Sequence, residues 1–536
     1  MAKLITENAE LLIYLDGKLH ITVLGGIKLT GLDRLKVTLK LIRTENKQNA
    51  FRHNLDLYNS IQTEQLIEKS AEALDMSTNE ISEAISNLTT ALENYRVERL
   101  EAMKPKQAEK KQLTEAERKA AITYLKSPDL LIRTKQAIAQ SGLVGEETNA
   151  LIAYLVYTSR KRHIPLHLMC LGASGTGKTW LQEKVSELMP EEDKLEITTL
   201  STNAFYYFGK EELKHKLLLI EDLDGAEAVL YPLRELQSKR KISKTVTLKD
   251  SKGNLKTVTL NVEGPVCVSG CTTREQLYED NANRCILLYM DTSNEQDQLI
   301  MEYQRQLSAG HIDQYEQQKI KEQIKNVQRL LKPITVKNPF ATYLKLPDEV
   351  FKPRRTMLLL LLFTETVTWY HQYQRELKTD TDTGEQYIET TLADVEIAFS
   401  LLENTLLKKS DELNDACRSF FERLKAYLKE QDAESFYSKE IRSAFRITPS
   451  SIGRYLYELE RMGYIKIARG NRYKGFEYKV TNWNDLEKLQ DNTQNMVKSI
   501  LESIRSVSCS PLVTQKPDGL LKVQKASKKQ ALSQAK

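Results

Sequence analysis

A glycine-rich run in the first third of the chain has the residue types and spacing of a phosphate-binding loop. It follows an apolar segment, Leu166 to Leu171, and opens a helical stretch from Thr179 to Met189. A turn of this kind between a buried strand and a helix points backbone N–H groups and the positive end of the helix at the phosphates of a nucleotide. The run consists of Gly172, Ala173, Ser174, Gly175, Thr176, Gly177, Lys178 and Thr179.

Two side chains at the end of this loop carry specific chemistry. In the pattern G-x-x-x-x-G-K-T, the lysine (Lys178) reaches the β- and γ-phosphates, and the hydroxyl of Thr179 ligates Mg²⁺. The stretch that follows is amphipathic, with Leu181 and Val185 on its apolar face. A strand before the loop and such a helix after it are the context that the motif requires, so the sequence predicts a nucleotide site.

Two adjacent carboxylates, Glu221 and Asp222, end a second apolar run, Leu217 to Ile220. In nucleotide-hydrolysing sites, a carboxylate in this position holds the Mg²⁺ shell and another residue orients the attacking water. Neighbouring carboxylates repel each other unless a cation lies near, which favours a metal site over simple packing. The usual order is Asp then Glu, and here it is reversed, so both acids are assigned to these two roles jointly. The loop and the acids together predict hydrolysis of ATP with Mg²⁺.

The elements that position these groups follow from periodicity. Alternating strand-like and helix-like segments continue to about Asp291, which indicates an α/β fold with a parallel sheet. Thr114 and Glu117 have the spacing of a capping box ahead of the first helix of this region. We therefore expect the ATPase core over residues 113–293 and a helical connector and lid over residues 294–412.

Other segments predict separate units. Residues 1–101 combine two extended stretches with a longer helical one, which indicates a small α+β unit. Residues 102–112 are charged and interrupted by Pro105, which favours an exposed linker. After Asp485 regular patterning fades and lysines accumulate, so we expect a basic, disordered tail over residues 485–536.

Composition bounds the class of protein. The chain has 536 residues, of which 40% are hydrophobic and 28% charged, typical of a globular protein with several domains. The longest strongly apolar run, Met357 to Phe363, is too short to cross a bilayer, and no secretory leader opens the chain, so we expect a cytoplasmic protein without membrane contact. The six cysteines are scattered and form no zinc-ligand pattern. A net charge of +5 permits nucleic-acid binding without requiring it.

The region from Leu113 to Lys409 resembles an AAA+ ATPase, and within that superfamily it is similar to the MCM-like helicases. After the carboxylate pair come a helix and two β-periodic runs, joined by a turn that contains Lys252. The resemblance implies a β-hairpin that projects into a central channel and grips DNA phosphates through Lys252, with Lys249 nearby. An exposed hairpin with solubilising lysines is the alternative.

Three further positions follow from the same resemblance. Thr272 ends a strand where the family places a polar sensor of the γ-phosphate, although the family usually has asparagine there. Arg284 stands before the last sheet strand, where the family keeps an arginine finger that reaches the nucleotide of a neighbouring subunit. Arg355, at the start of a lid helix, is the preferred second sensor, and Arg354 is the alternative.

Residues 413–484 resemble a winged helix. The pattern is two helices followed by two strands, with Gly470-Asn471-Arg472 between the strands. Thr448 and Pro449 begin the second helix, where the missing N–H of proline costs nothing. Outward basic residues suit phosphate contacts, and Arg454 and Arg472 are the candidates. Winged helices also bind proteins, so both functions stay open.

These features together predict an ATP-dependent DNA helicase that assembles as a homo-oligomeric ring, expected to be a hexamer. The chain resembles the helicase half of primase-helicase proteins of bacterial mobile elements and phages. It shows neither the zinc motif nor the acidic primase fold of those proteins, so a primase or another replication partner would supply primer synthesis. The alternative is a non-helicase AAA+ loader, or a regulator of transposition or replication, that assembles on DNA.

Overall fold

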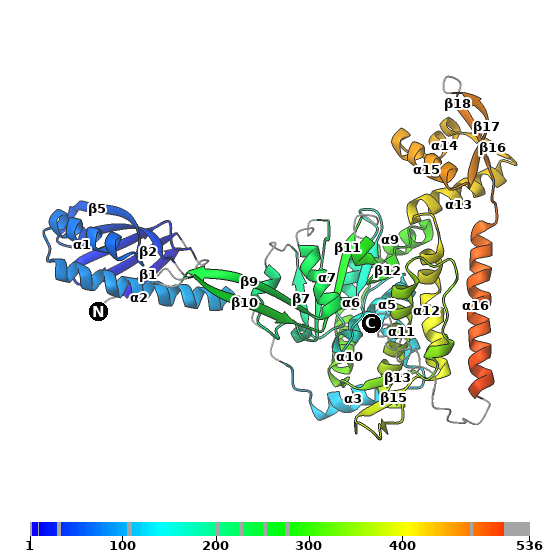
Figure 1. Cartoon of the computed structure of the whole chain (residues 1–536), viewed down its shortest axis with the longest axis horizontal. Helices are drawn as coiled ribbons and strands as arrows, with labels where there is room; N and C mark the ends of the chain where they lie inside the picture. Colours follow the sequence, from blue (N-terminus) through cyan, green and yellow to red (C-terminus); the bar gives the residue numbers. More distant parts are fainter. Residues whose placement is uncertain are drawn as a thin grey trace, which may run out of the picture. The chain divides into compact units, whose positions relative to one another are not determined.

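The chain forms two compact units, each described here by itself (Figure 1). One unit comprises residues 1–111 with 243–260, and the other comprises residues 112–242 with 261–536. The computed structural model describes residues 3–8, 10–28, 34–103, 110–198, 204–224, 229–249, 255–273, 279–471 and 475–508. Within these ranges, no helix combines the length and the apolar character that crossing a membrane requires.

The first unit is built on an antiparallel sheet of five strands in sequence order, with two helices against one face, which confirms the expected α+β class. Alternate strand residues such as Leu12, Ile21 and Leu39 are fully buried, as the two-residue period of a half-covered sheet requires. They pack against apolar residues of both helices. The elements are β1 (Lys3–Asn8), β2 (Leu11–Asp16), β3 (Leu19–Leu24), β4 (Lys36–Arg43), β5 (Asn46–Asp56), α1 (Ser60–Leu74) and α2 (Thr78–Met103).

The second unit contains the predicted parallel sheet, with strand order β12-β6-β11-β8-β7. Its strands are β6 (Leu168–Leu171), β7 (Lys194–Ile197), β8 (Lys216–Ile220), β11 (Val266–Thr272) and β12 (Ile286–Tyr289). The helices of this part are α3 (Glu115–Leu125), α4 (Leu130–Gln140), α5 (Glu147–Thr158), α6 (Lys178–Ser186), α7 (Leu230–Lys239) and α8 (Glu279–Ala282). Thr114 and Glu117 make the predicted capping box at α3. The central strands are buried on both faces, as expected of a parallel sheet between helices.

A two-stranded hairpin is inserted between β8 and β11, as the sequence predicts. Its strands are β9 (Lys241–Lys249) and β10 (Leu255–Glu263), and their turn lies outside the described residues. The base of the hairpin belongs to the second unit, whereas residues 243–260 group with the first. The division expected from the sequence placed the whole hairpin in the ATPase core.

Helices continue the second unit after the sheet. They are α9 (Asn294–Ser308), α10 (Gln314–Leu330), α11 (Pro353–Tyr370) and α12 (Leu392–Ser410), with a small sheet of β13 (Thr335–Lys337), β14 (Lys378–Thr379) and β15 (Gln386–Glu389). The helices α11 and α12 share a large apolar core with α5. Residues of α12 and α11 such as Phe399 and Phe363 are almost fully buried there.

A winged helix follows α12. It consists of α13 (Asp415–Glu430), β16 (Ser435–Tyr437), α14 (Ser438–Phe445), α15 (Pro449–Arg461), β17 (Ile465–Asn471) and β18 (Gly475–Val480), with its own apolar core. The three strands pair in the order β16-β18-β17. The Arg418 guanidinium donates hydrogen bonds to Asp411, just before this domain, and to Asp485, just after it. The chain therefore enters and leaves the winged helix at one point.

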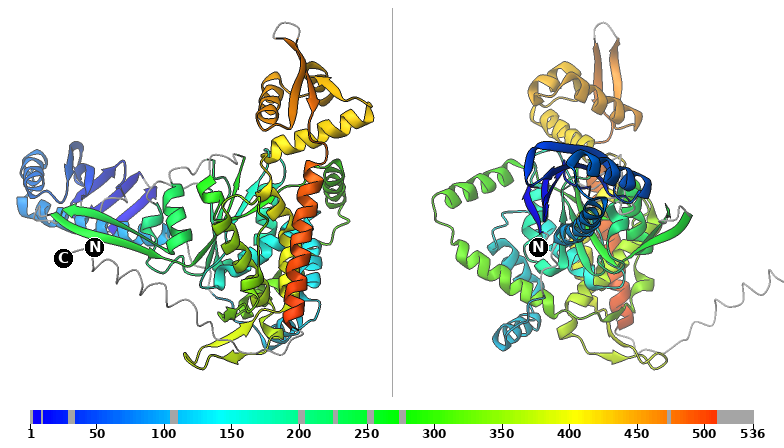
Figure 2. Two further views of the ribbon diagram at one scale, coloured as in Figure 1. Left: turned by 45° about the vertical axis from the view of Figure 1, so that its right-hand side comes forward. Right: turned by 90° about the vertical axis from the view of Figure 1, so that its left-hand side faces the viewer.

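The expectation of an irregular tail from residue 485 is wrong for its first part. Residues Asp485–Ser508 form the long helix α16 (Figure 2). Ile500 and Ile504 on α16 are buried in the same core as α11 and α12. Their four-residue spacing, continued back to Met496, is a helical pattern that the surrounding polar residues obscure. The rest of the predicted tail, residues 509–536, lies outside the described residues.

Candidate nucleotide site

The glycine-rich loop lies between β6 and α6, as the motif requires. Gly175 and Gly177 have positive φ angles of 83° and 87°, a conformation that side-chain-bearing residues rarely adopt. Gly177 directly precedes α6, so the backbone N–H groups at the start of this helix face the loop. Such a cradle of N–H groups at a helix N-terminus fits a polyphosphate.

Lys178 is held inside this loop and is only 8% exposed. Its Nζ donates hydrogen bonds to the carbonyl oxygens of Gly172 and Ala173, at 2.9 and 2.6 Å. The Thr176 hydroxyl donates to the same Ala173 carbonyl at 3.0 Å. The ammonium group therefore lies within the curve of the loop, where it can meet a phosphate bound by the backbone.

The two predicted acids lie at the end of β8 and differ in their surroundings. Glu221 and Thr179 line one small cavity of about 90 Å³ together with Glu183 and Glu196. Burial, followed by the negative charges of Glu221 and Glu196, raises the pKa of Glu183. Asp222 instead accepts a hydrogen bond from the backbone N–H of Asp224 at 2.8 Å. The oxygens of Thr179 and Glu221 thus border a common space suited to a divalent cation.

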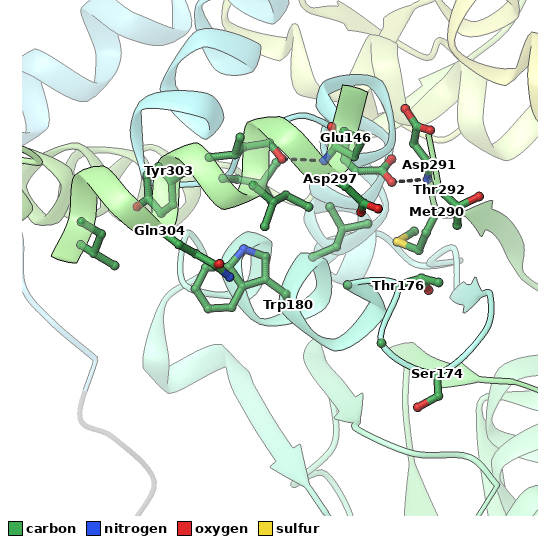
Figure 3. Close-up of a pocket in the computed structure, with 18 residues that line it drawn as sticks. Glu146, Ser174, Thr176, Trp180, Met290, Asp291, Thr292, Asp297, Tyr303 and Gln304 are labelled. Carbon is green, nitrogen blue, oxygen red and sulfur yellow. Dashed lines mark hydrogen bonds between the residues drawn. The ribbon is translucent and has the colours of Figure 1, made fainter. Parts of the chain in front are cut away.

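A cavity of about 480 Å³ opens beside the phosphate-binding loop (Figure 3). Ser174 to Gly177 form one wall, and α9 contributes Ile300, Tyr303 and Gln304 to the other. Trp180, on α6, lies beside Gln304 of α9 in this cavity, and the residue is 48% exposed. The volume and the mixture of apolar, aromatic and polar walls match small-ligand sites of nucleoside size.

Glu146 is a site residue that the sequence analysis missed. It adopts a left-handed backbone conformation with φ 51° before α5, and it lines the same cavity. Its carboxylate accepts hydrogen bonds from the backbone N–H of Asp291 and from Asn149, both at 2.5 Å. Burial raises the pKa of Glu146. The only signal in the sequence was an acid after Gly145 between two helical segments, which is too common a pattern to single out.

The preceding residue explains the shape of this loop. Gly145 has φ 64°, and a Cβ atom there would collide with the side chain of Gln296 on α9. Gln296 donates a hydrogen bond to the Val144 carbonyl at 3.1 Å. The glycine therefore lets the loop before α5 and the first turn of α9 close together around one side of the cavity.

Thr272 lies at the same edge of the sheet as the phosphate-binding loop, because it pairs with Leu171 at the end of β6. Its hydroxyl donates a hydrogen bond to Asp224 at 2.6 Å. The backbone N–H and the hydroxyl of Thr273 donate to the same carboxylate, at 3.1 and 2.7 Å. Asp224, which the sequence analysis did not assign, therefore links the ends of β8 and β11 next to the predicted metal ligands.

Arg284 lies near the amino-terminal ends of the sheet strands, whereas the phosphate-binding loop follows the carboxyl end of β6. It precedes β12, whose first residue Ile286 pairs with Leu168 at the start of β6. From there to Gly172 is roughly 13 Å at about 3.3 Å per residue. The guanidinium donates a hydrogen bond to Ser238 of α7 at 2.7 Å. Arg284 therefore lies away from the phosphate-binding loop of its own chain.

The structure does not bring the remaining predicted residues into the cavity. Arg355 lies in the first turn of α11 and is not among the residues lining the cavity. Arg454 is exposed on α15, with its guanidinium 5.3 Å from the ring centroid of Tyr455. Lys249 is the last residue of β9. Lys252 and Arg472 lie outside the described residues.

Comparison with known proteins identifies the nucleotide region. Residues 115–333 match the family described as the MTBMA_p00010 P-loop domain. The chain thus contains an α/β P-loop domain with a five-stranded parallel sheet, as the sequence predicts. A search of curated proteins finds no significant match.

Two solved structures illustrate the structural similarities. The full-length MCM homolog from Methanopyrus kandleri is 13% identical with a TM-score of 0.38, and the match covers 76% of this chain and 75% of that one. A Drosophila ORC chain, from a complex bound to DNA, is 13% identical with a TM-score of 0.22, and the match covers 74% of this chain and 98% of that one.

Proposed function

We propose, on the basis of this P-loop domain, that the protein hydrolyses ATP. The observation that carries the proposal is that the phosphate-binding loop itself forms one wall of the larger cavity. The phosphate-binding loop and its lysine adjoin a nucleoside-sized cavity that contains Trp180, so one nucleotide can occupy both. In this arrangement the base lies between Trp180 and α9, and the phosphates lie on the loop.

Mg²⁺ fits beside the γ-phosphate position, where Thr179 and Glu221 border the same cavity. When bound there, the ion would offset phosphate charge during hydrolysis. We assign Glu221 to the metal shell, because it shares the space with Thr179. Asp222, the next residue outward, is then assigned to orienting the attacking water, with Thr272 and Asp224 fixing the neighbouring strand end.

We further propose that hydrolysis drives movement on DNA, in a ring of identical subunits. Two features support this proposal. The β9–β10 hairpin is inserted between the carboxylate strand and the strand of Thr272, in the position predicted for a DNA-contacting hairpin with Lys249 and Lys252. Arg284 lies at the end of the strands opposite to its own phosphate-binding loop, so a catalytic role for it requires the nucleotide of a neighbouring subunit.

The winged helix is assigned to DNA contact as well. On α15, Arg454 and Arg461 are exposed on the same helix as Tyr457, which is 67% exposed. Cations beside an aromatic ring suit phosphates and exposed bases. The same proposal extends to Arg472, which stands in the sequence between β17 and β18 and outside the described residues. Arg355 remains the candidate for a second sensor contributed by the lid.

Strand displacement on a forked duplex tests the helicase proposal. The wild-type protein should separate a labelled strand in the presence of ATP and Mg²⁺, and Lys178→Ala should not, because Lys178 contacts the phosphates. ATP hydrolysis that DNA stimulates without any strand separation would favour the loader or regulator alternative. Absence of hydrolysis in the wild-type protein would refute the ATPase proposal itself.

A further inference from the structure

The amino-terminal sheet has a second face that its helices do not cover. Both α1 and α2 pack on the face formed by residues such as Tyr14, Ile21 and Leu39. The intervening residues point to the opposite side, because successive side chains of a strand alternate. On that side Ile5 and Leu15 are 38% and 41% exposed.

The strand register places these outward residues in rows across the sheet. One row crosses all five strands and consists of Ile5, Ile13, Thr22, Lys40 and Arg52. The adjacent row contains Leu15, His20, Ile42 and Ala50. The outer face is therefore aliphatic over β1 and β2. Over β4 and β5 the first row carries Lys40 and Arg52, whereas Ile42 and Ala50 keep the second row uncharged.

Three cations of β4 and β5 point to this outer face. Lys36 and Arg52 are exposed and Lys40 is half-buried. None of the three forms an ion pair with any residue that the structure describes. Asp56 is the acid opposite Lys36, and its Oδ1 accepts hydrogen bonds from the backbone N–H groups of Leu35 and Tyr58. A local excess of positive charge thus lies on the same face as the aliphatic residues, with Lys40 two strand spacings, about 10 Å, from Ile13 in the same row.

We propose that this outer face binds single-stranded nucleic acid. Phosphates would lie along Lys36, Lys40 and Arg52 on β4 and β5, and unpaired bases would cover the aliphatic residues on β1 and β2, which include Ile5 and Leu15. Unpaired bases have apolar faces to bury, whereas the surface of a duplex offers mainly phosphates, so an apolar area beside the cations favours a single strand. The proposal concerns the first unit alone and does not depend on the nucleotide site.

The test uses the full chain without ATP and measures fluorescence anisotropy of labelled thirty-nucleotide DNA, RNA of equal length and a duplex, over a series of salt concentrations. The triple variant Lys36→Gln, Lys40→Gln, Arg52→Gln should weaken single-strand binding at least ~10-fold at 0.1 M salt. It should also reduce the slope of log affinity against log salt by about 2, since each lost phosphate contact contributes about 0.7. The DNA and RNA arms identify which strand is preferred.

A matched control removes the same charge elsewhere. Lys69→Gln, Lys119→Gln, Lys126→Gln changes three exposed lysines on α1, α3 and the following turn. This variant should retain affinity and slope, and both triple variants should retain the circular dichroism of the wild type. Equal losses in the two triple variants, or no loss in the first, would overturn the proposal.

A second variant tests the aliphatic residues on β1 and β2. Ile5→Ser, Leu15→Ser changes two exposed side chains, so folding should persist. It should weaken single-strand binding about 3- to 10-fold while leaving the salt slope and duplex binding unchanged. Equal weakening for single strand and duplex, or none for either, would show that bases do not contact this face.

Discussion

At the scale of single residues, Trp180 offers a direct report on the nucleotide cavity. It is 48% exposed on α6 and lines the cavity, with the Lys184 ammonium 4.6 Å from its ring centroid. Of the two other tryptophans, Trp369 is fully buried and Trp483 belongs to the connection after the winged helix. Addition of ATP should change tryptophan fluorescence in the wild type. Trp180→Phe should lose most of that signal, and an equal signal in both proteins would place the base elsewhere.

The two acids after β8 predict different defects. Because Glu221 borders the space beside Thr179, Glu221→Gln should raise the Mg²⁺ concentration needed for half-maximal hydrolysis. Asp222→Asn should leave that concentration unchanged while lowering the maximal rate about 100-fold or more. Titrating Mg²⁺ at saturating ATP separates the two effects. Reversed defects would exchange the roles assigned to Glu221 and Asp222.

Lys409, near the end of α12, predicts a pH-dependent stability. Burial lowers its pKa to about 8, with the nearby Cys285 opposing the shift. The charged form is therefore disfavoured in the folded state, and the resulting destabilisation is complete below pH 8 and fades as the pH rises toward 10.5. Lys409→Met should raise the free energy of unfolding at pH 7 by on the order of 1–3 kcal/mol. Thermal unfolding of both proteins should show a smaller difference at pH 10, and a constant difference would contradict the assignment.

At the scale of elements, the sequence was sufficient to predict local structure where a known motif and the spacing of apolar residues indicate the same element. The capping box at Thr114 and the strand, loop and helix around Lys178 are such cases. Contacts made over long sequence distances were not predictable. Glu146 enters the site only because Gly145 lets its loop approach Gln296 on α9. Asp224 is held by the hydroxyl groups of Thr272, the last residue of β11, and of Thr273 after it, which no spacing in the sequence reveals.

Helix α16 packs into the apolar core of the second unit through one face. Its residue Ile504 is fully buried, and Arg505 pairs with Glu396 of α12 at 2.6 Å. Ile504→Ala should lower the free energy of unfolding by about 2–4 kcal/mol, because the lost side chain leaves a cavity in the core. Glu502→Ala, at an exposed position of the same helix, should have little effect. Thermal unfolding measures both changes, and equal stability of the two variants would contradict this packing.

At the scale of the whole molecule, the position of Arg284 predicts complementation between inactive variants. Arg284→Ala keeps the phosphate-binding loop, and Lys178→Ala keeps the arginine. If sites are shared between subunits, mixed assemblies contain some interfaces that combine an intact loop with an intact arginine. Each variant alone should hydrolyse ATP at a few per cent of the wild-type rate or less, and an equimolar mixture should recover up to about a quarter of it. A mixture no more active than its components would refute a shared site.

Arg418 contacts residues at both ends of the winged helix, and this arrangement makes the domain replaceable as a unit. Arg418 contacts Asp411 before the domain and Asp485 after it, while α12 and α16 pack together beyond that point. The winged helix is therefore an inserted domain: its two ends lie close together, and the helices before and after it pack against each other. Another domain whose two ends lie equally close together could replace it without altering the path of the surrounding chain or the P-loop domain.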